Sequence, residues 1–313
     1  MSRPVTCIFS LAVFSLALLS AWSTRAQLRP CSDNSFLNPI SAEEIGQANG
    51  EPRGSKFLVR DFRFKGLVHD ADVVRARILK EIQESKFHGR NSEWLDEIAE
   101  NIVRGDFQNR GYFEVDVDDL EVQPFDPNDP KQGVIIFAPV KEGDKFSTGD
   151  ISIVSADPES SLTIPEAELR QQFKLEKGDA LNVDEIRRGI NSAVHLYGNR
   201  GFMDVTMTPT FNIDRKGDVV EMILRISEGR KYFVERFGLL GLNSTTTAQL
   251  ESKMPPGAMV DYRLLDEIFK LGQASASISA SLFNSSRINR NVETGTVDIT
   301  FDFTVCAPNK NLK

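Results

Sequence analysis

The sequence predicts an α+β fold made of tandem βααββ units, in which each unit is a three-stranded mixed sheet with two helices on one face. Two repeated phrases are the main evidence. Arg-Gly-Tyr-Phe-Glu-Val at 110–115 returns 90 positions later as Arg-Gly-Phe-Met-Asp-Val at 200–205. An apolar run closes in Glu-Gly at Gly143 and, 86 positions later, at Gly229. Self-similarity at a fixed period indicates a repeated structural unit.

The first unit, residues 57–143, opens with a strand followed by two helices. Phe62 and Phe64 alternate with charged residues, as in a strand with one face buried. The helices are predicted at 70–82 and 93–103, because apolar residues recur there at helical spacing. These residues are Val74, Ile78, Leu79 and Ile82 in the first helix and Leu95, Ile98 and Ile102 in the second. Ser92 is a good N-cap for the second helix.

Two further strands complete the first unit. Gly111 ends the helical region, and the aromatic and β-branched residues of 112–117 predict a strand. The Asp-Pro-Asn-Asp-Pro segment at 126–130 predicts a turn. Apolar residues at consecutive positions over 134–140 then predict a central strand.

The second and third units, residues 144–229 and 230–307, follow the same order. The second is predicted to contain strand 150–154, helix 165–173, helix 183–197, strand 202–207 and strand 219–226. The third is more divergent, with strand 232–241, helices 245–254 and 260–271, and strands 278–283 and 297–305. It lacks the Arg-Gly-aromatic phrase.

The segments outside the units predict export. Residues 1–26 have a positive start, an apolar run and small residues, which is typical of a secretory signal peptide. An uncleaved membrane anchor is the alternative, because the apolar run is nearly long enough to span a bilayer. Residues 27–56 read as a linker and 308–313 as a tail. In an oxidising compartment Cys31 and Cys306 would form a disulfide; otherwise they remain two free thiols.

Composition and motifs argue against an enzyme and against nucleic acid. The formal net charge is −8, whereas nucleic-acid binding needs basic patches. His69, His88 and His195 do not have metal-ligand spacing, and no nucleophile or phosphate-binding motif is present. The acidic cluster at 116–119 would suit calcium, but it lacks an EF-hand loop. We therefore expect no catalytic residue, no cofactor, no metal and no small-molecule substrate.

The repeated unit resembles the POTRA domain. The resemblance rests on the strand-then-glycine start, the paired apolar helices, the Gly-Asn-Arg-Gly-Phe phrase ending at 202 with its counterpart ending at 112, Leu-Glu-Lys-Gly-Asp at 175–179, and the closing Glu-Gly. It covers about 57–307. Such units usually precede a membrane β-barrel that inserts or exports outer-membrane polypeptides, and nothing after Val305 predicts barrel strands. The resemblance implies an array that stands alone or docks onto a separate barrel protein.

The resemblance also implies where a partner would bind. The strand after the second helix is expected at the sheet edge, where it could accept an extended peptide by β-augmentation. The candidate segments are 112–117, 202–207 and 278–283. The candidate peptide-binding residues are Tyr112, Phe113, Val115, Phe202, Met203 and Val205. The alternatives are that these side chains pack in the core, as Phe202 and Val205 favour, or that one edge pairs with a neighbouring unit.

Three functions remain open at this stage. The first is a scaffold, free in the periplasm or associated with the outer membrane, that binds unfolded outer-membrane polypeptides or a separate β-barrel assembly protein during assembly or secretion. The second is a membrane-anchored envelope or division interaction protein, which requires residues 1–26 to be retained. The third is a secreted hydrolase on an unfamiliar α+β scaffold, for which no residue of the sequence is a candidate.

Overall fold

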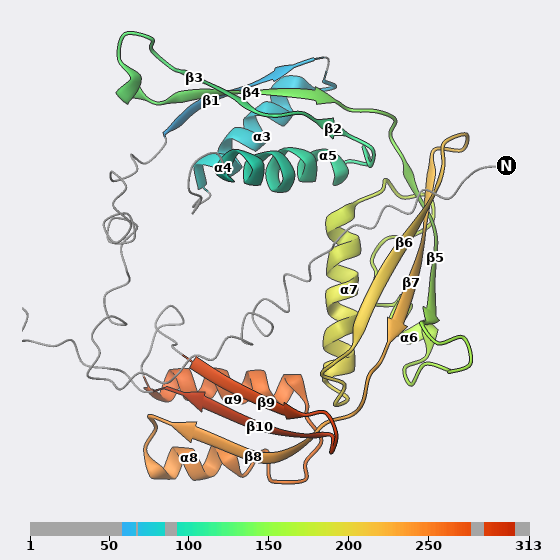
Figure 1. Cartoon of the computed structure of the whole chain (residues 1–313), viewed down its shortest axis with the longest axis vertical. Coiled ribbons are helices and arrows are strands. Elements are labelled where there is room, and N and C mark those ends of the chain that lie inside the picture. The colour runs from blue at the N-terminus through green and yellow to red at the C-terminus, as the bar shows by residue number, and fades with distance from the viewer. Residues whose placement is uncertain (1–57, 67, 85–92, 277–284, 304–313) are drawn as a thin grey trace, which may run out of the picture.

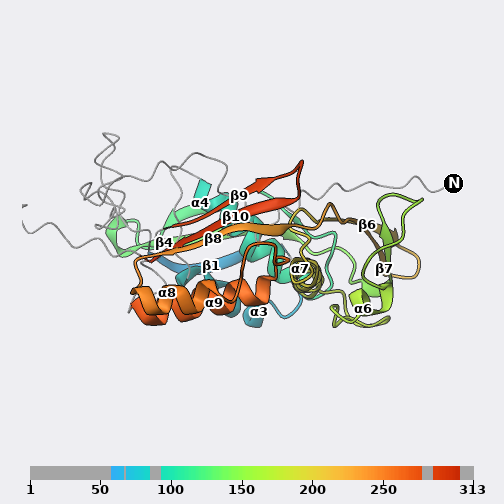
Figure 2. The same ribbon diagram turned by 90° about the horizontal axis from the view of Figure 1, so that it is seen from below.

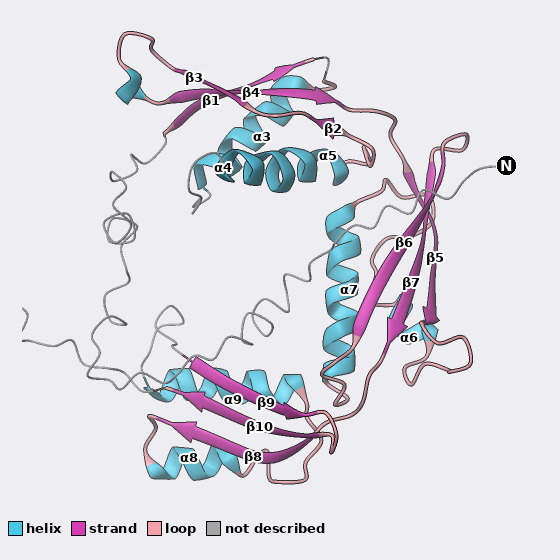
Figure 3. Cartoon of the chain, in the orientation of Figure 1, coloured by secondary structure: helices cyan, strands magenta, loops and turns pink. Residues whose placement is uncertain are grey.

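The computed structural model describes residues 58–66, 68–84, 93–276 and 285–303. These residues form three units that follow one another along an arc (Figure 1). Each unit has one mixed sheet with helices packed against it, so the predicted α+β class is confirmed (Figure 3). The predicted signal peptide, linker and tail, with Cys31 and Cys306, lie outside the described residues.

The first unit places its helices beneath a sheet whose central strand is the last in sequence. Its elements are β1 (Val59–Lys65), α3 (Ala71–Glu84), α4 (Glu93–Glu97), the π-helical η2 (Ile98–Arg104), α5 (Gly105–Gln108), β2 (Asp116–Val117), β3 (Glu121–Pro124), the short 3-10 helix η3 (Pro130–Gln132) and β4 (Val134–Lys141). β4 lies parallel to β1 and antiparallel to β2 and β3. This confirms the prediction of a central strand at 134–140. Phe62 and Ile136 pair across β1 and β4 and are fully buried against the helices.

The second unit repeats this topology with longer strands. It comprises β5 (Ser147–Ser155), α6 (Glu166–Arg170), α7 (Val183–Gly198), β6 (Thr206–Asp214) and β7 (Val219–Ser227). β7 is central, parallel to β5 and antiparallel to β6. Asn182 caps the start of α7, where its side chain accepts a hydrogen bond from the amide of Glu185. Tyr197 of α7 and Leu224 of β7 are both fully buried in this unit's core.

The third unit, although divergent in sequence, has the same order. Its elements are β8 (Phe233–Leu240), α8 (Ser244–Glu251), α9 (Tyr262–Ala276), β9 (Ser285–Asn291) and β10 (Thr296–Asp302). β10 is central, between parallel β8 and antiparallel β9. Figure 2 shows this sheet lying over α8 and α9. Along β10, the buried residues Val297, Ile299 and Phe301 alternate with half-buried polar residues.

Two predicted strands begin later than expected. The segment 112–117 is a strand only at Asp116–Val117, and 202–207 only from Thr206 onward. The cause lies in the preceding glycines, since Gly111 and Gly201 have φ angles of 99° and 88°. Such positive φ turns the chain, and the next residues pass toward the following unit before the strand starts. The predicted strand 278–283 lies outside the described residues.

Candidate functional site: sheet edges and the turns between units

Each sheet has two margins, and both are places where a peptide could add. The strand orders β5-β7-β6 and β8-β10-β9 leave the first strand on one margin and the strand after the second helix on the other. In the first unit β1 lies opposite β2 and β3. A margin strand with unpaired N–H and C=O groups is a template for another strand. Whether those groups are paired therefore decides which margin is available.

The first-strand margin of the second unit is closed by the loop that precedes α7. The amide of Thr148 donates to the carbonyl of Asp179 at 2.7 Å, and the amide of Gly178 donates to the carbonyl of Thr148 at 2.8 Å. Further along β5, the amide of Ile153 donates to Glu166 Oε1 of α6 at 3.4 Å. Main-chain groups on this margin of β5 are thus already used.

The third unit closes its first strand in the same way. The amide of Val234 donates to the carbonyl of Ala258 at 2.8 Å, and the amide of Gly257 donates to the carbonyl of Val234 at 2.7 Å. The amide of Leu239 donates to Glu251 Oε1 of α8 at 3.0 Å. Gly257 has a positive φ of +83°, and Gly178, at the equivalent position of the second unit, has a φ of +93°. The glycine at this position lets the loop turn back onto the strand.

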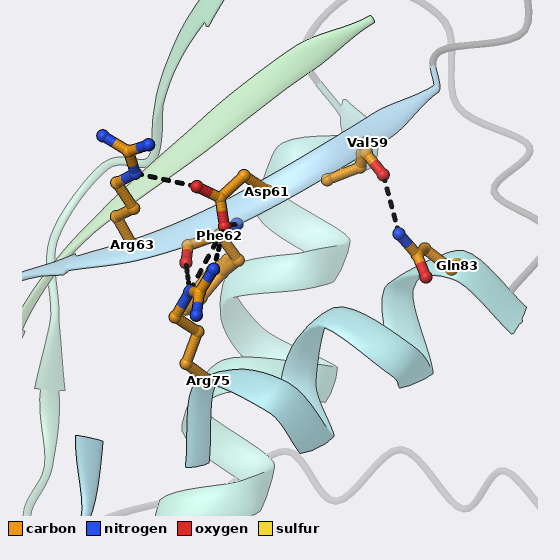
Figure 4. Close-up of polar contacts among 6 residues, drawn as sticks. All are labelled: Val59, Asp61, Phe62, Arg63, Arg75 and Gln83. Carbon is orange, nitrogen blue, oxygen red and sulfur yellow. Dashed lines mark hydrogen bonds and ion pairs between the residues drawn. The ribbon is translucent and has the colours of Figure 1, made fainter. Parts of the chain in front are cut away.

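In the first unit, side chains take over this role (Figure 4). Gln83 Nε2 donates to the carbonyl of Val59 at 3.0 Å, and Arg75 Nε donates to the carbonyl of Phe62 at 2.8 Å. The amide of Phe62 donates to Asp61 Oδ1 at 2.9 Å. Asp61 also pairs with Arg75 and Arg63. Burial acts to raise the pKa of Asp61, but the hydrogen bonds from Arg75, Arg63 and Phe62 lower that pKa below its usual value.

The opposite margin of the second unit is open. All nine residues of β6 are in register with β7. Within the described part of the chain, the main chain of β6 makes no hydrogen bond on its other side. Along β6, Met207 and Ile213 are half-buried and pack against the core, whereas Thr208 faces solvent. β6 therefore presents unpaired main-chain groups, apart from the N–H that Pro209 lacks, next to the half-buried side chains of Met207 and Ile213.

The sequence-predicted site residues do not lie on these open margins. Tyr112, Phe113, Val115, Phe202, Met203 and Val205 all precede the strands proper. Tyr112 is half-buried and the other five are buried. They belong to two equivalent turns, here called the joint turns, which comprise residues 110–115 and 200–205. The third, fourth and sixth residues of each turn are the apolar ones.

The two joint turns divide their apolar side chains between neighbouring cores. Tyr112 and Val115 pack in the core of the first unit, and Phe202 and Val205 pack in that of the second. The side chain between the two members of each pair packs in the following unit. Phe113 enters the second core, where its ring centroid lies 5.3 Å from that of Phe211, and Met203 enters the third core. The side chain of the fourth residue of each joint turn is thus inserted into the core of the next unit.

Main-chain hydrogen bonds repeat at both joint turns. The carbonyl of Gly111 accepts from the amide of Phe146 at 2.8 Å, and the carbonyl of Gly201 accepts from the amide of Tyr232 at 2.9 Å. Phe146 and Tyr232 each stand just before the first strand of the next unit and are fully buried. The main chain of each joint turn is thus hydrogen-bonded to the residue that directly precedes the first strand of the next sheet.

The fifth residue of each joint turn is an acid that pairs with an arginine of the next unit. Glu114 accepts from Arg215 Nε at 3.1 Å, and a second bond from the Arg215 guanidinium makes the pair bidentate. Asp204 pairs with Arg290 and also accepts from the hydroxyl of Tyr232. Burial and the hydrogen bond to Asp204 raise the pKa of Tyr232 to about 12.

The ends of the long helices add a contact that differs between the two junctions. At the first, Asn109 Nδ2 donates to Asp184 Oδ2 at 2.6 Å, and the amide of Asp184 donates to Asn109 Oδ1 at 2.9 Å. At the second, the ring of Tyr262 lies on Gly198, where a Cβ atom would come within 2.2 Å of it. The contact at the first junction is polar, whereas at the second an aromatic ring packs in the space left by a glycine without a side chain.

Other candidate sites find no support in the described residues. Within them, no group of three or more His, Cys, Asp or Glu side chains is arranged to hold a metal ion. Asp116 and Asp118 of the acidic cluster lie 3.0 and 3.8 Å from Lys141 Nζ. None of the described helices has both the length and the apolar character that a membrane span requires. His88 lies outside the described residues.

Comparison with known proteins finds a family model that matches the second unit. The POTRA family model, described as a surface antigen variable number repeat, matches residues 148–229. Outer membrane protein assembly factor BamA of Neorickettsia risticii (strain Illinois) is 22% identical over 203 residues, which cover 63% of this chain and 26% of that protein. BamA of Neisseria meningitidis serogroup B is 27% identical over 141 residues, 44% of this chain and 17% of that protein. The chain thus spans about a quarter or less of the length of these relatives.

The fold is also that of a solved structure. The crystal structure of Haemophilus influenzae BamA POTRA3-5 superposes with a TM-score of 0.60 at 20% sequence identity. The match covers 80% of this chain and 98% of that one, so the similarity extends over three consecutive units. At this identity the similarity concerns the fold.

Proposed function

The chain contains a POTRA domain at residues 148–229, and on that premise we propose that it is a periplasmic, non-enzymatic scaffold for outer-membrane protein assembly or secretion. Its clients are unfolded outer-membrane polypeptides or a separate β-barrel assembly protein. Two relatives are named outer membrane protein assembly factor, which supports this class of process. The shared fold with a three-domain POTRA segment of BamA supports the scaffold role.

The observation that carries the proposal is a difference between the two margins of the second unit's sheet: main-chain groups are already hydrogen-bonded on one margin and unpaired on the other. β5 is closed by Asp179, Gly178 and Glu166, whereas β6 is open. A client segment adds to β6 in extended form, through main-chain hydrogen bonds that tolerate many sequences. The sequence predicts the peptide on the segments 112–117, 202–207 and 278–283, of which the last lies outside the described residues. The open strand proper, Thr206–Asp214, now takes that place.

The chemistry of β6 favours a segment with alternating apolar residues. On an added strand, every second side chain would point to the helix side, beside the half-buried Met207 and Ile213. The other side chains would point to solvent, beside Thr208. Strands of outer-membrane barrels alternate in this way, with apolar residues on one face only.

Site-specific crosslinking tests the proposal with a matched control. Thr208 on β6 and Val154 on β5 are both exposed and both pair with Arg225 of β7, one on each side. A photo-reactive residue at either position thus probes one margin of the same sheet. With a synthetic peptide of alternating apolar residues, we expect a crosslink from position 208 and none from 154. Equal yields from both positions, or none from 208, would overturn the proposal.

A further inference from the structure

The joint turns and the open margins share structural elements. Arg215, which pairs with Glu114 of the first joint turn, directly follows the last residue of β6. Arg290, which pairs with Asp204 of the second joint turn, lies within β9 itself. In both cases the acid of one unit holds the strand after the second helix in the next unit. The joint is therefore connected to the strand that forms the open margin.

Each joint restrains the next unit through contacts that point in different directions. At the second junction, Met203 is inserted in the third core, and the carbonyl of Gly201 bonds the amide of Tyr232. Asp204 pairs with Arg290 on β9, and the Tyr262 ring lies on Gly198 at the end of α7. A single contact would allow rotation about itself. Several contacts separated in space oppose rotation about any axis, because each would have to break or stretch.

β9 resembles β6 as an open margin. It pairs with β10 along Ser285–Asn291, and the carbonyl of Asn291 also accepts from Gly295 in the hairpin that leads to β10. Among the described residues, no hydrogen bond reaches the main chain of β9 from the side away from β10. In Figure 1, β6 and β9 each form the margin of their sheet that is turned toward the inside of the arc. Two open strands in consecutive units are thus connected through one joint.

We propose that the second joint holds β6 and β9 at a fixed separation, so that one polypeptide carrying two extended segments binds both strands at once. This inference rests on the proposed function. It adds that the partner is a chain with two β-competent segments and that Asp204, Met203 and Gly198 are positioning residues. They touch no client, but they determine the distance between the two places where a client is held.

The physical gain is one of effective concentration. After the first segment binds, the second is confined near the other strand, and its binding becomes intramolecular. The gain is largest when the linker between the segments matches the span and falls for longer linkers. A rigid joint makes this dependence on linker length sharp. A loose joint spreads the span over many values and lowers the maximum.

A peptide series tests the inference on the full chain. The probes are a fluorescent one-segment peptide of alternating apolar residues and two-segment peptides with Gly-Ser linkers of graded length. For the wild type we expect at least about tenfold tighter binding at one linker length, with one peptide per protein, and weaker binding at longer linkers. If no linker length improves on the one-segment peptide, the inference is wrong while the proposed function stands. If the one-segment peptide does not bind, both are wrong.

Variants at the joint separate coupling from folding. Asp204→Asn keeps an acceptor for Tyr232 but removes the charge that pairs with Arg290. We expect unchanged one-segment affinity and at least about threefold loss of the two-segment gain. Asp298→Asn is the control, because Asp298 pairs with Arg236 inside the third unit and should leave the gain intact. Gly198→Ala disturbs the same joint independently of Asp204. A gain unaltered in both joint variants overturns the proposal.

Discussion

Glu228 receives three hydrogen bonds, and the shortest comes from Thr163: the carboxylate accepts from the Thr163 amide at 2.6 Å and from its hydroxyl at 2.7 Å. The hydroxyl of the buried Tyr197 donates to it at 2.7 Å. Glu142, the equivalent residue of the first unit, accepts from the amide of His69 at 3.0 Å. The glutamate of the repeated Glu-Gly ending thus holds the turn that precedes the first helix of its own unit.

The first prediction concerns this glutamate. Glu228→Ala leaves the amide of Thr163 and the buried hydroxyl of Tyr197 without their acceptor. Because an unsatisfied buried group costs free energy, we expect the free energy of unfolding to fall by about 1–3 kcal/mol in urea titrations. Glu221→Ala, an exposed position on the same strand β7, should change it by less than about 0.5 kcal/mol. Equal effects of the two substitutions would contradict the role given to Glu228.

The second prediction compares two glycines. In Gly198→Ala the new Cβ would come within 2.2 Å of the Tyr262 ring, which must move. We expect a loss of about 1–3 kcal/mol in the free energy of unfolding, as for other overpacked sites. Small-angle X-ray scattering should also detect a changed or broader distribution of molecular dimensions, because the ring belongs to the third unit.

Gly105 is the matched control for Gly198. It lies in a helix with φ of −57°, and a Cβ there would meet nothing within 4 Å. Gly105→Ala should therefore raise the free energy of unfolding by about 0.5–1 kcal/mol, since alanine loses less backbone entropy in a helix. A stabilising effect at both positions would show that the Tyr262 ring is not held on Gly198.

The third prediction concerns alkaline pH. The pKa of Tyr232 is raised to about 12 from its usual value of 10.0. Ionisation in the unfolded chain begins near the lower value, so the stabilisation is present below pH 10 and is lost as pH rises through about 12. Urea midpoints of the wild type should fall between these pH values more steeply than those of Tyr232→Phe. Parallel curves for the two proteins would contradict the buried bond to Asp204.

The fourth prediction concerns acid pH and the closed margin of β1. The pKa of Asp61 is lowered from 3.8, so its contribution is present above that value and is lost as pH falls through the lower pKa of the folded state. Asp61→Asn should lose about 1–2 kcal/mol of unfolding free energy at pH 7, from weakened bonds to Arg75 and Phe62. The difference from wild type should shrink toward pH 2. A difference that stays constant with pH would mean that the Asp61 charge does not matter.

Much of the fold could be predicted because its signals are local. The alternation of Phe62 and Phe64, the stripe formed by Val74, Ile78 and Ile82, and the alternation near Val297 report period 2 or the helical period directly. The structure places all six of these side chains at least half-buried. The Glu-Gly and Arg-Gly phrases could be recognised as repeats by comparison within the chain, without knowledge of their contacts.

The candidate site was harder to predict for a physical reason. Phe113 and Met203 are apolar residues between other apolar residues, so they resembled strand positions of their own unit. An apolar side chain indicates that it will be buried, but its identity does not specify against which neighbour. The signal that could have separated them is the positive-φ glycine two residues earlier, which interrupts the strand.

The sequence by itself determined the number and type of units, because strand and helix periodicity depend on residues a few positions apart. The tertiary structure alone decided which margins are closed and where the joint turns insert. Gly178 of the loop before α7 bonds Thr148 of β5, Arg75 of α3 bonds Asp61 of β1, and Met203 enters a core built from residues 232–303. These contacts depend on long-range packing, in which the surface offered by one unit selects the partner from the next.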